Sequence, residues 1–228
     1  FDNIPLFIED MTEQIMKVND LMDAEQKQEA KEWTELSYEL NDERKIIAQT
    51  AIDEAIKLMP YVLTFNDNIG CCTIQDNTRS KNITFTKNDE TCSVKDLLCK
   101  RIMITEEDES TKTFDCFYLE MHDGDSRIIL PLKSETQVCS LGDTPRLFVH
   151  FPLIGPNHFG INFLFHSHRF TPEESRDNII VPKDNDATDK TAMENKQVLD
   201  EMTMMLWNFL EANVHTWTDA IKMASLHI

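Results

Sequence analysis

The chain has 228 residues, of which 41% are hydrophobic and 28% are charged. This composition is typical of a globular protein with a buried core and excludes the disordered and fibrous classes. The formal net charge is −19 and no section of the chain is net basic, which argues against direct contact with nucleic acid. The longest apolar runs, such as 159–165, are too short to cross a bilayer. We therefore expect a cytoplasmic protein with no membrane partner, and the first residue, Phe1, predicts a segment of a longer polypeptide.

The N-terminal part of the chain is predicted to be helical. Residues 26–40 are rich in Glu, Lys, Gln and Ala, as in an exposed helix, and follow a connecting segment at 20–25. A second helix is expected to begin at Asn41. Its apolar side chains at helical spacing are Ile47, Ala51, Ala55 and Leu58. We expect Pro60 to end this helix, because proline removes a helical hydrogen bond.

After Pro60, short runs rich in β-branched and aromatic residues predict strands. These runs are 61–65, 72–75, 83–86, 101–105, 114–121, 127–132 and 147–151. The Asp123-Gly124 pair predicts a tight hairpin between 114–121 and 126–132, because it tolerates positive φ. The acidic run 106–109 is interpreted as a solvated hairpin tip rather than a metal cluster.

The helical period returns after residue 190. Its broad apolar face predicts a helix that is buried on more than one side. The residues of this face are Val198, Leu199, Met202, Met205, Leu206, Phe209, Leu210 and Trp217. Helices that flank a block of strands predict an α+β fold with a mixed or antiparallel sheet. We expect a helical connector at 1–42, an α+β domain at 43–185, and a C-terminal helix at 186–228 that packs on it or on a neighbouring domain.

The cysteines and glycines exclude two kinds of site. The six cysteines contain no C-x-x-C pair, which predicts reduced thiols, with Cys116 as a small hydrophobe in a strand. The chain has only five glycines, against roughly sixteen at an average usage of about 7%. It contains neither G-x-x-x-x-G-K-[ST] nor G-x-G-x-x-G. We therefore expect no self-contained site for ATP in this chain.

Two histidines are the candidates for metal chemistry. His166 and His168 lie on one face if their segment is a strand, and His150 or His158 would add a further ligand. This arrangement suggests a metal-dependent hydrolase. The alternative is a polar strand end with no metal. A Ser-His-Asp hydrolase is less well supported, because no G-x-S-x-G motif positions a serine nucleophile.

Four segments carry a resemblance to a known family. They are 147–155 (LFVHFPLIG), 160–165 (GINFLF), 169–177 (RFTPEESRD) and 58–66 (LMPYVLTFN). The order is a strand ending in Phe151-Pro152-Leu153, a loop, a Gly-led apolar strand, and a short loop with an arginine. This pattern resembles bacterial sacsin-like ATPases of the GHKL superfamily, which includes gyrase and the ninety-kilodalton heat-shock chaperone. The resemblance covers roughly residues 43–185.

The resemblance implies a middle, transducer-like domain downstream of the ATP-binding module. The superfamily's ATP-site signatures, an Asn-bearing helix and an Asp-x-Gly-x-Gly loop, are missing from this sequence. The implied cofactors, ATP and Mg²⁺, therefore belong to the parent protein, and none is expected in this chain. The implied partner is the upstream ATP-binding module of the same polypeptide, with a homodimer in the parent. In relatives, a Lys or Arg of the middle domain reaches the γ-phosphate.

By this resemblance, Arg176 is the first candidate for that residue, Arg169 the second and Lys133 the third. A long cation on a loop suits the role, because it neutralises charge on the transferred phosphoryl group. The alternative for Arg176 is a structural ion pair with Glu173 or Asp177. The run 171–174 (TPEE) also fits the first turn of a helix.

A function of another class also fits the sequence. The acidic, Met-rich helices are compatible with an autonomous protein-protein interaction module that uses no nucleotide. An upstream sequence with the Asn-bearing helix and the glycine loop would favour the transducer. An upstream sequence without them would favour the interaction module.

Overall fold

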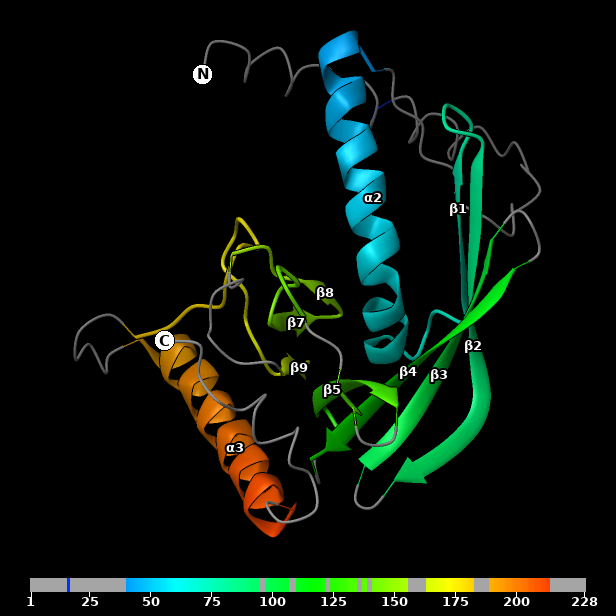
Figure 1. Ribbon diagram of the computed structural model, residues 1–228. Helices are drawn as coiled ribbons and strands as arrows, with labels where there is room; N and C mark the ends of the chain where they lie inside the picture. The colour runs from blue at the N-terminus through cyan, green and yellow to red at the C-terminus, as the bar shows by residue number, and fades with distance from the viewer. Residues whose placement is uncertain are drawn as a thin grey trace. The chain divides into compact units, whose positions relative to one another are not determined.

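Nine strands and two long helices make up the part of the chain that the structure describes, a computed structural model (Figure 1). The described residues are Met16 and 40–94, 97–106, 110–121, 124–134, 137–138, 141–155, 163–182 and 189–213. The elements are α2 (Asp42–Phe65), β1 (Cys71–Asp76), β2 (Lys81–Val94), β3 (Leu97–Glu106), β4 (Thr111–Glu120), β5 (Ser126–Ser134), β6 (Gln137–Val138), β7 (Leu147–Val149), β8 (Phe151–Pro152), β9 (Leu164–Ser167) and α3 (Lys190–Asn213). The chain divides into two units, Phe1–Lys45 and Ile46–Ile228, and the sheet and α3 belong to the second. The predicted helix at 26–40 and connection at 20–25 fall almost entirely outside the described residues.

The strands form one mixed sheet in the order β1-β2-β3-β4-β5-β9-β7-β8, with β6 paired to β5. Every pairing is antiparallel except that of β7 with β9, which is parallel. The predicted α+β fold with flanking helices is therefore confirmed. The predicted hairpin is confirmed too, since β4 pairs with β5 in a register that sets Tyr118 opposite Ile129. Gly124 in its turn has φ of +69°.

The alternation of side chains along the strands divides the core between two faces. On β4, Phe117 and Leu119 pack in a cluster with Met202 of α3. Their neighbours Cys116 and Tyr118 pack in the opposite cluster, with the C-terminal part of α2. The sheet between β4 and β9 is therefore covered by α3 on one face and by the end of α2 on the other. Cys116 is a buried thiol in β4 that forms no disulfide, as predicted.

The prediction that Pro60 ends its helix is wrong. Helix α2 begins at Asp42 as expected, with the Asn41 Oδ1 accepting a hydrogen bond from the Arg44 amide at 2.9 Å. It then continues through Pro60 to Phe65, so the predicted strand at 61–65 is the last turn of the helix. A proline inside a helix costs about 3 kcal/mol, but the side chains of Tyr61, Val62, Leu63 and Phe65 are buried. Burying each contributes about 1.5–3 kcal/mol, which outweighs the proline.

The predicted strand at 147–151 is interrupted in the middle. His150 has φ of +61°, and the chain reverses there, so that β8 folds back antiparallel on β7 with Val149 opposite Phe151. This reversal places the imidazole of His150 at a turn instead of within a strand. The acidic run 106–109 begins with Glu106, the last residue of β3, and its residues 107–109 are outside the described part.

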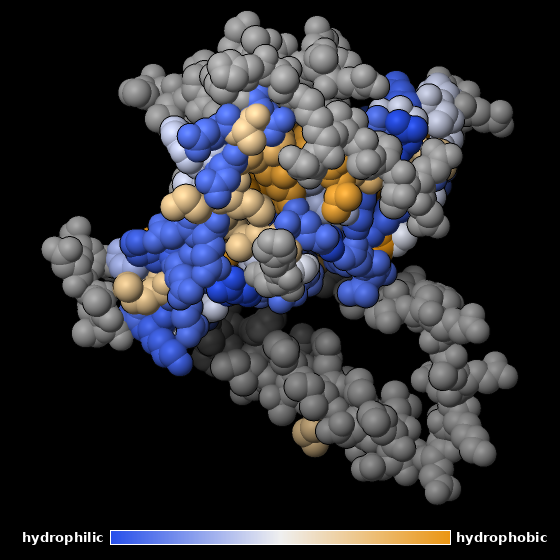
Figure 2. Space-filling view, turned by 90° about the horizontal axis from the view of Figure 1, so that it is seen from below, coloured by the Kyte–Doolittle hydropathy of each residue, from blue (hydrophilic) through white to orange (hydrophobic). Residues whose placement is uncertain are grey.

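Helix α3 matches the predicted C-terminal helix, with its main stripe in the core. Val198, Met202, Leu206 and Phe209 are buried, while Leu199, Met205 and Leu210 are partly buried against the same cluster. Trp217 lies outside the described residues. None of the helices in the described part has the length and apolar character needed to cross a membrane. On the face in Figure 2, hydrophilic residues surround a smaller hydrophobic area.

Candidate functional site

Arg176, the first candidate from the sequence, lies at the tip of a loop formed by residues 171–180. The loop is closed by a β-bridge between Pro172 and Ile179 and by the amide of Ile180, which donates to the Thr171 carbonyl at 3.2 Å. Arg176 is exposed and has φ of +56°. Because Pro172 takes part in a β-bridge, the run 171–174 is not the first turn of a helix, and that interpretation is wrong.

Helix α3 holds the base of this loop through one buried amide. Asn195 is fully buried. Its Nδ2 donates to the carbonyls of Thr171 and Ile180, each at 2.8 Å, and its Oδ1 accepts from the Thr171 amide at 2.8 Å. A buried amide with this many partners fixes the backbone on both sides of the loop. The position of the loop is therefore tied to the position of α3.

The tip of the loop is held against the chain that follows β8. The amide of Gly155 donates to the Asp177 carbonyl at 2.7 Å. A Cβ added at Gly155 would lie 2.5 Å from the same carbonyl oxygen. Glycine is therefore needed at position 155 for this close approach of two backbones. Asp177 follows Arg176 in the sequence, so the contact fixes the backbone beside Arg176.

The guanidinium of Arg176 has a carbonyl partner. Its Nη2 donates to the Val149 carbonyl at 3.2 Å. Glu173 and Asp177 are both described, and no ion pair between Arg176 and either of them is present. The side chain is thus anchored by one hydrogen bond at the exposed edge of the molecule, beside the turn at His150.

Arg169, the second candidate, is placed differently. Its Nη1 pairs with Oε2 of Glu201 on α3 at 2.7 Å. The charge of Arg169 is therefore paired, and the ion pair joins the chain just before the loop to α3. The side chain of Lys133, the third candidate, lies outside the described residues.

Three imidazoles lie together beside Arg176. His166 is at the end of β9 and His168 follows in the next turn. The ring of His168 lies 4.6 Å from that of His166 and 4.2 Å from that of His150, measured between centroids. Nδ1 of His168 is 3.1 Å from Nε2 of His150. We call His150, His166 and His168 the histidine cluster. His158, another suggested ligand, lies outside the described residues.

The cluster is built around a buried, neutral histidine. His166 is fully buried, and its Nδ1 is 3.2 Å from the Phe148 carbonyl, which makes Nδ1 the protonated nitrogen. Burial, followed by the influence of His168, lowers the pKa of His166 to about 3. Burial also lowers the pKa of His150, with further lowering by His168 and Arg176. The groups that influence these two imidazoles are therefore cationic or neutral.

Two buried polar atoms near the cluster lack partners among the described residues. They are Nε2 of His166 and Nη1 of Arg127. The two residues are opposite each other in the pairing of β5 with β9. The other guanidinium atoms of Arg127 are paired, since Nε donates to Glu120 at 3.0 Å and Nη2 to Asp67 at 2.9 Å.

Asp67 is the anion that ties the end of α2 to the sheet. Burial alone would raise its pKa, but hydrogen bonds from Arg127 and Lys100 outweigh that effect and lower it. Burial would likewise lower the pKa of Arg127, and its bonds to Asp67 and Glu120 raise it instead. This network is structural: it holds the chain after α2 over the strands that carry the histidine cluster.

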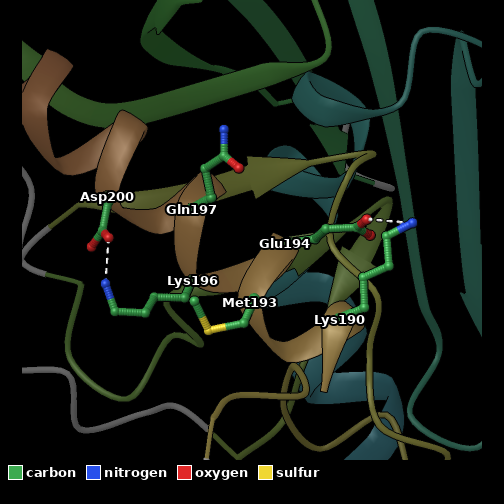
Figure 3. Close-up of a pocket in the computed structure, with 6 residues that line it drawn as sticks. All are labelled: Lys190, Met193, Glu194, Lys196, Gln197 and Asp200. Carbon is green, nitrogen blue, oxygen red and sulfur yellow. Dashed lines mark hydrogen bonds and ion pairs between the residues drawn. The ribbon is translucent and has the colours of Figure 1, made fainter. Parts of the chain in front are cut away.

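A metal site and a surface hollow on α3 are weaker candidates among the described residues. No group of three or more His, Cys, Asp or Glu side chains among them is arranged to hold a metal ion. A hollow of about 300 Å³ lies along α3, lined by Lys190, Met193, Glu194, Lys196, Gln197 and Asp200 (Figure 3). The four charged side chains that line the hollow are already paired within the helix, Lys190 with Glu194 at 3.7 Å and Lys196 with Asp200 at 2.5 Å. We therefore centre the site on Arg176 and the histidine cluster.

Sequence reasoning identified Arg176, His166 and His168 but missed the residues that position them. Asn195 carries the only signal that was available, a polar residue on the apolar stripe of α3, three residues before Val198. Gly155 was part of the family pattern without a stated role. The partnership of Arg127 with Asp67 joins residues 60 positions apart, and no local pattern indicates it.

Comparison with known proteins adds no relative to this description. No protein-family model matches the chain, and no curated protein or solved structure is significantly similar to it.

Proposed function

We propose that this chain is the middle, transducer-like domain of a sacsin-like GHKL ATPase, which couples ATP binding and hydrolysis in an upstream module to conformational change. In this proposal Arg176 reaches the γ-phosphate of ATP that the upstream module binds with Mg²⁺. The chain alone is inactive, acts in the cytoplasm, and dimerises in the parent protein through the ATP-binding module. The resemblance in the sequence suggests the role, and the placement of Arg176 is the observation that carries it.

Arg176 has three properties that the role requires. It is exposed, it lies at the tip of a loop at the edge of the sheet, and its guanidinium is held by one carbonyl without an ion pair to Glu173 or Asp177. A guanidinium in this state can leave its carbonyl for a phosphate at small cost, because phosphate accepts stronger, charge-assisted hydrogen bonds. Positive charge at the transferred phosphoryl group stabilises its transition state.

The route from the loop to the rest of the domain runs through α3. Asn195 binds the loop at Thr171 and Ile180, and Glu201 binds Arg169 at its start. A displacement of Arg176 toward a phosphate therefore pulls on two points of the same helix. This connection supports the transducing part of the proposal.

The test compares two exposed arginines in the parent protein. Arg176→Ala is expected to lower the ATP turnover rate by about 10²-fold or more, as for other arginines that act on a transferred phosphoryl group, with little change in the Kd of ATP. Arg44→Ala removes the same charge from an exposed position near the start of α2 and is expected to leave turnover unchanged. Equal turnover in the wild type and Arg176→Ala would refute the proposal.

A second candidate is the interaction module, favoured by one surface of α3. Met204 and Trp207 are exposed by 61% and 65% and lie three residues apart on the helix. Exposed tryptophan is unusual and is enriched where proteins bind one another. Trp207→Ala distinguishes the candidates: an interaction module loses its partner with no effect of Arg176→Ala, whereas a transducer depends on Arg176.

A further inference from the structure

We propose that His150, His168 and Arg176 together form an oxyanion-binding site whose ligand is a phosphate group. The inference deepens the proposed function and rests on it for the source of the phosphate, the terminal group of ATP. It adds two histidines that the family resemblance does not assign. The site is partial, because the upstream module holds the rest of the nucleotide in this proposal.

The geometry brings these three side chains together from two separate turns. His150 and Arg176 both have positive φ, at 61° and 56°, and Arg176 donates to the residue just before His150. Such backbone conformations are strained in a residue other than glycine and are concentrated at functional sites. His168 completes the group, with its Nδ1 3.1 Å from Nε2 of His150.

The surroundings favour an anion as the ligand. Burial and then His168 are the main causes that lower the pKa of His150 and of His166. Arg176 lowers the first further and Arg127 the second, so both guanidiniums act on the cluster. A divalent metal ion would add positive charge beside them, and no arrangement for a metal is present among the described residues. The net charge of the whole chain is −19, but His150, His168 and Arg176 contribute no negative charge. A phosphate would supply that charge and accept hydrogen bonds from the guanidinium.

His166 forms the floor of the site. It is fully buried, and its Nε2 lacks a partner among the described residues. Since Nδ1 donates to the Phe148 carbonyl, Nε2 is an acceptor and needs a donor. The ring of His168 lies 4.6 Å from that of His166, so the ring with this unpartnered nitrogen lies beside the proposed site.

The test is a titration of the purified chain with inorganic phosphate, followed through the imidazole NMR signals. We expect saturable shifts for His150 and His168, and the same titration with chloride at equal ionic strength should not produce them. Arg176→Ala and His168→Gln should each weaken phosphate binding by about tenfold. Lys57→Ala removes an exposed cation on α2 and should change nothing. Circular dichroism of each variant checks that it is folded.

The outcomes separate this site from the proposed function. Phosphate shifts that do not saturate, or that chloride reproduces, would overturn the site. Saturable binding of Zn²⁺ through the same imidazoles, with none of phosphate, would also overturn it in favour of a metal site. If phosphate binds but Arg176→Ala leaves ATP turnover unchanged in the parent, the site stands and the transducer role fails. If phosphate does not bind but turnover falls, the role stands and the site fails.

Discussion

Asn195 pairs with the backbone of Thr171 through both ends of its side-chain amide, donating to the carbonyl and accepting from the amide at 2.8 Å each. The side chain thus acts as a strand edge would, although it belongs to a helix. A third bond, to the Ile180 carbonyl, closes the loop that carries Arg176. This one residue connects the C-terminal helix to the candidate site.

Asn195→Ala should destabilise the protein strongly. The substitution removes three hydrogen bonds in the interior and leaves backbone groups without partners, which costs about 2–4 kcal/mol. Urea unfolding measures the difference. Asn208→Ala, an exposed asparagine of the same helix, is the matched control and should change the free energy of unfolding by less than about 0.5 kcal/mol. Equal effects of the two substitutions would contradict the role of Asn195.

Gly155→Ala should displace the Arg176 loop. The new Cβ would lie 2.5 Å from the Asp177 carbonyl oxygen, and both groups belong to backbone, so one segment has to move. We expect a loss of about 1–3 kcal/mol of stability and lower ATP turnover in the parent. Gly70→Ala is the control, because a Cβ there meets nothing within 4 Å. If both alanine variants match the wild type, the close approach at Gly155 does not constrain the loop.

His166 should make the protein sensitive to acid. Its folded pKa of about 3 is below the ordinary value of 6.5, so between these pH values the unfolded chain binds a proton that the folded protein does not. Stability is therefore highest above about pH 6.5 and falls toward pH 3, by up to about 1.4 kcal/mol per pH unit. His166→Gln cannot titrate, so its free energy of unfolding should depend less on pH in that range. Identical pH slopes would exclude this contribution.

Asp67→Asn should loosen the chain after α2 from the sheet. The substitution leaves the nearly buried guanidinium of Arg127 with Glu120 alone, and Asp67 itself is 56% exposed, so we expect a moderate loss of about 1–3 kcal/mol. Asp42→Asn is the control, since that carboxylate is 97% exposed and its ion pair is with Lys45, nearby in sequence. Thermal unfolding compares the two variants, and an Asp67→Asn protein as stable as the control would show that the network contributes little.

Local patterns predicted the elements whose stability is mostly local. The β4–β5 hairpin follows from alternating strands around an Asp-Gly turn, and α3 from its apolar stripe. The end of α2 was mispredicted, because the decisive energy comes from burying Tyr61 to Phe65 against strands that follow later in the sequence. Pro60 is visible in the sequence, whereas the contacts that outweigh it are not.

The candidate site follows the same rule. The sequence indicates Arg176 through a family pattern and His166 with His168 through their spacing. It does not indicate that His150 turns back at positive φ and meets His168. Nor does it show that Asn195 holds the loop from a helix that lies 24 residues later than Thr171. Functional side chains have recognisable chemistry, but the residues that position them are determined by tertiary contacts.

The most direct test of the central claim is whether ATP in the parent protein covers the side chain of Arg176. Phenylglyoxal modifies accessible guanidiniums, and mass spectrometry measures the rate at each arginine. The account predicts that a non-hydrolysable ATP analogue slows modification of Arg176 while ADP does not, with Arg79, which is paired with Asp53 and Asp76, unaffected by either. Equal modification of Arg176 with the ATP analogue, with ADP and without nucleotide would contradict the account.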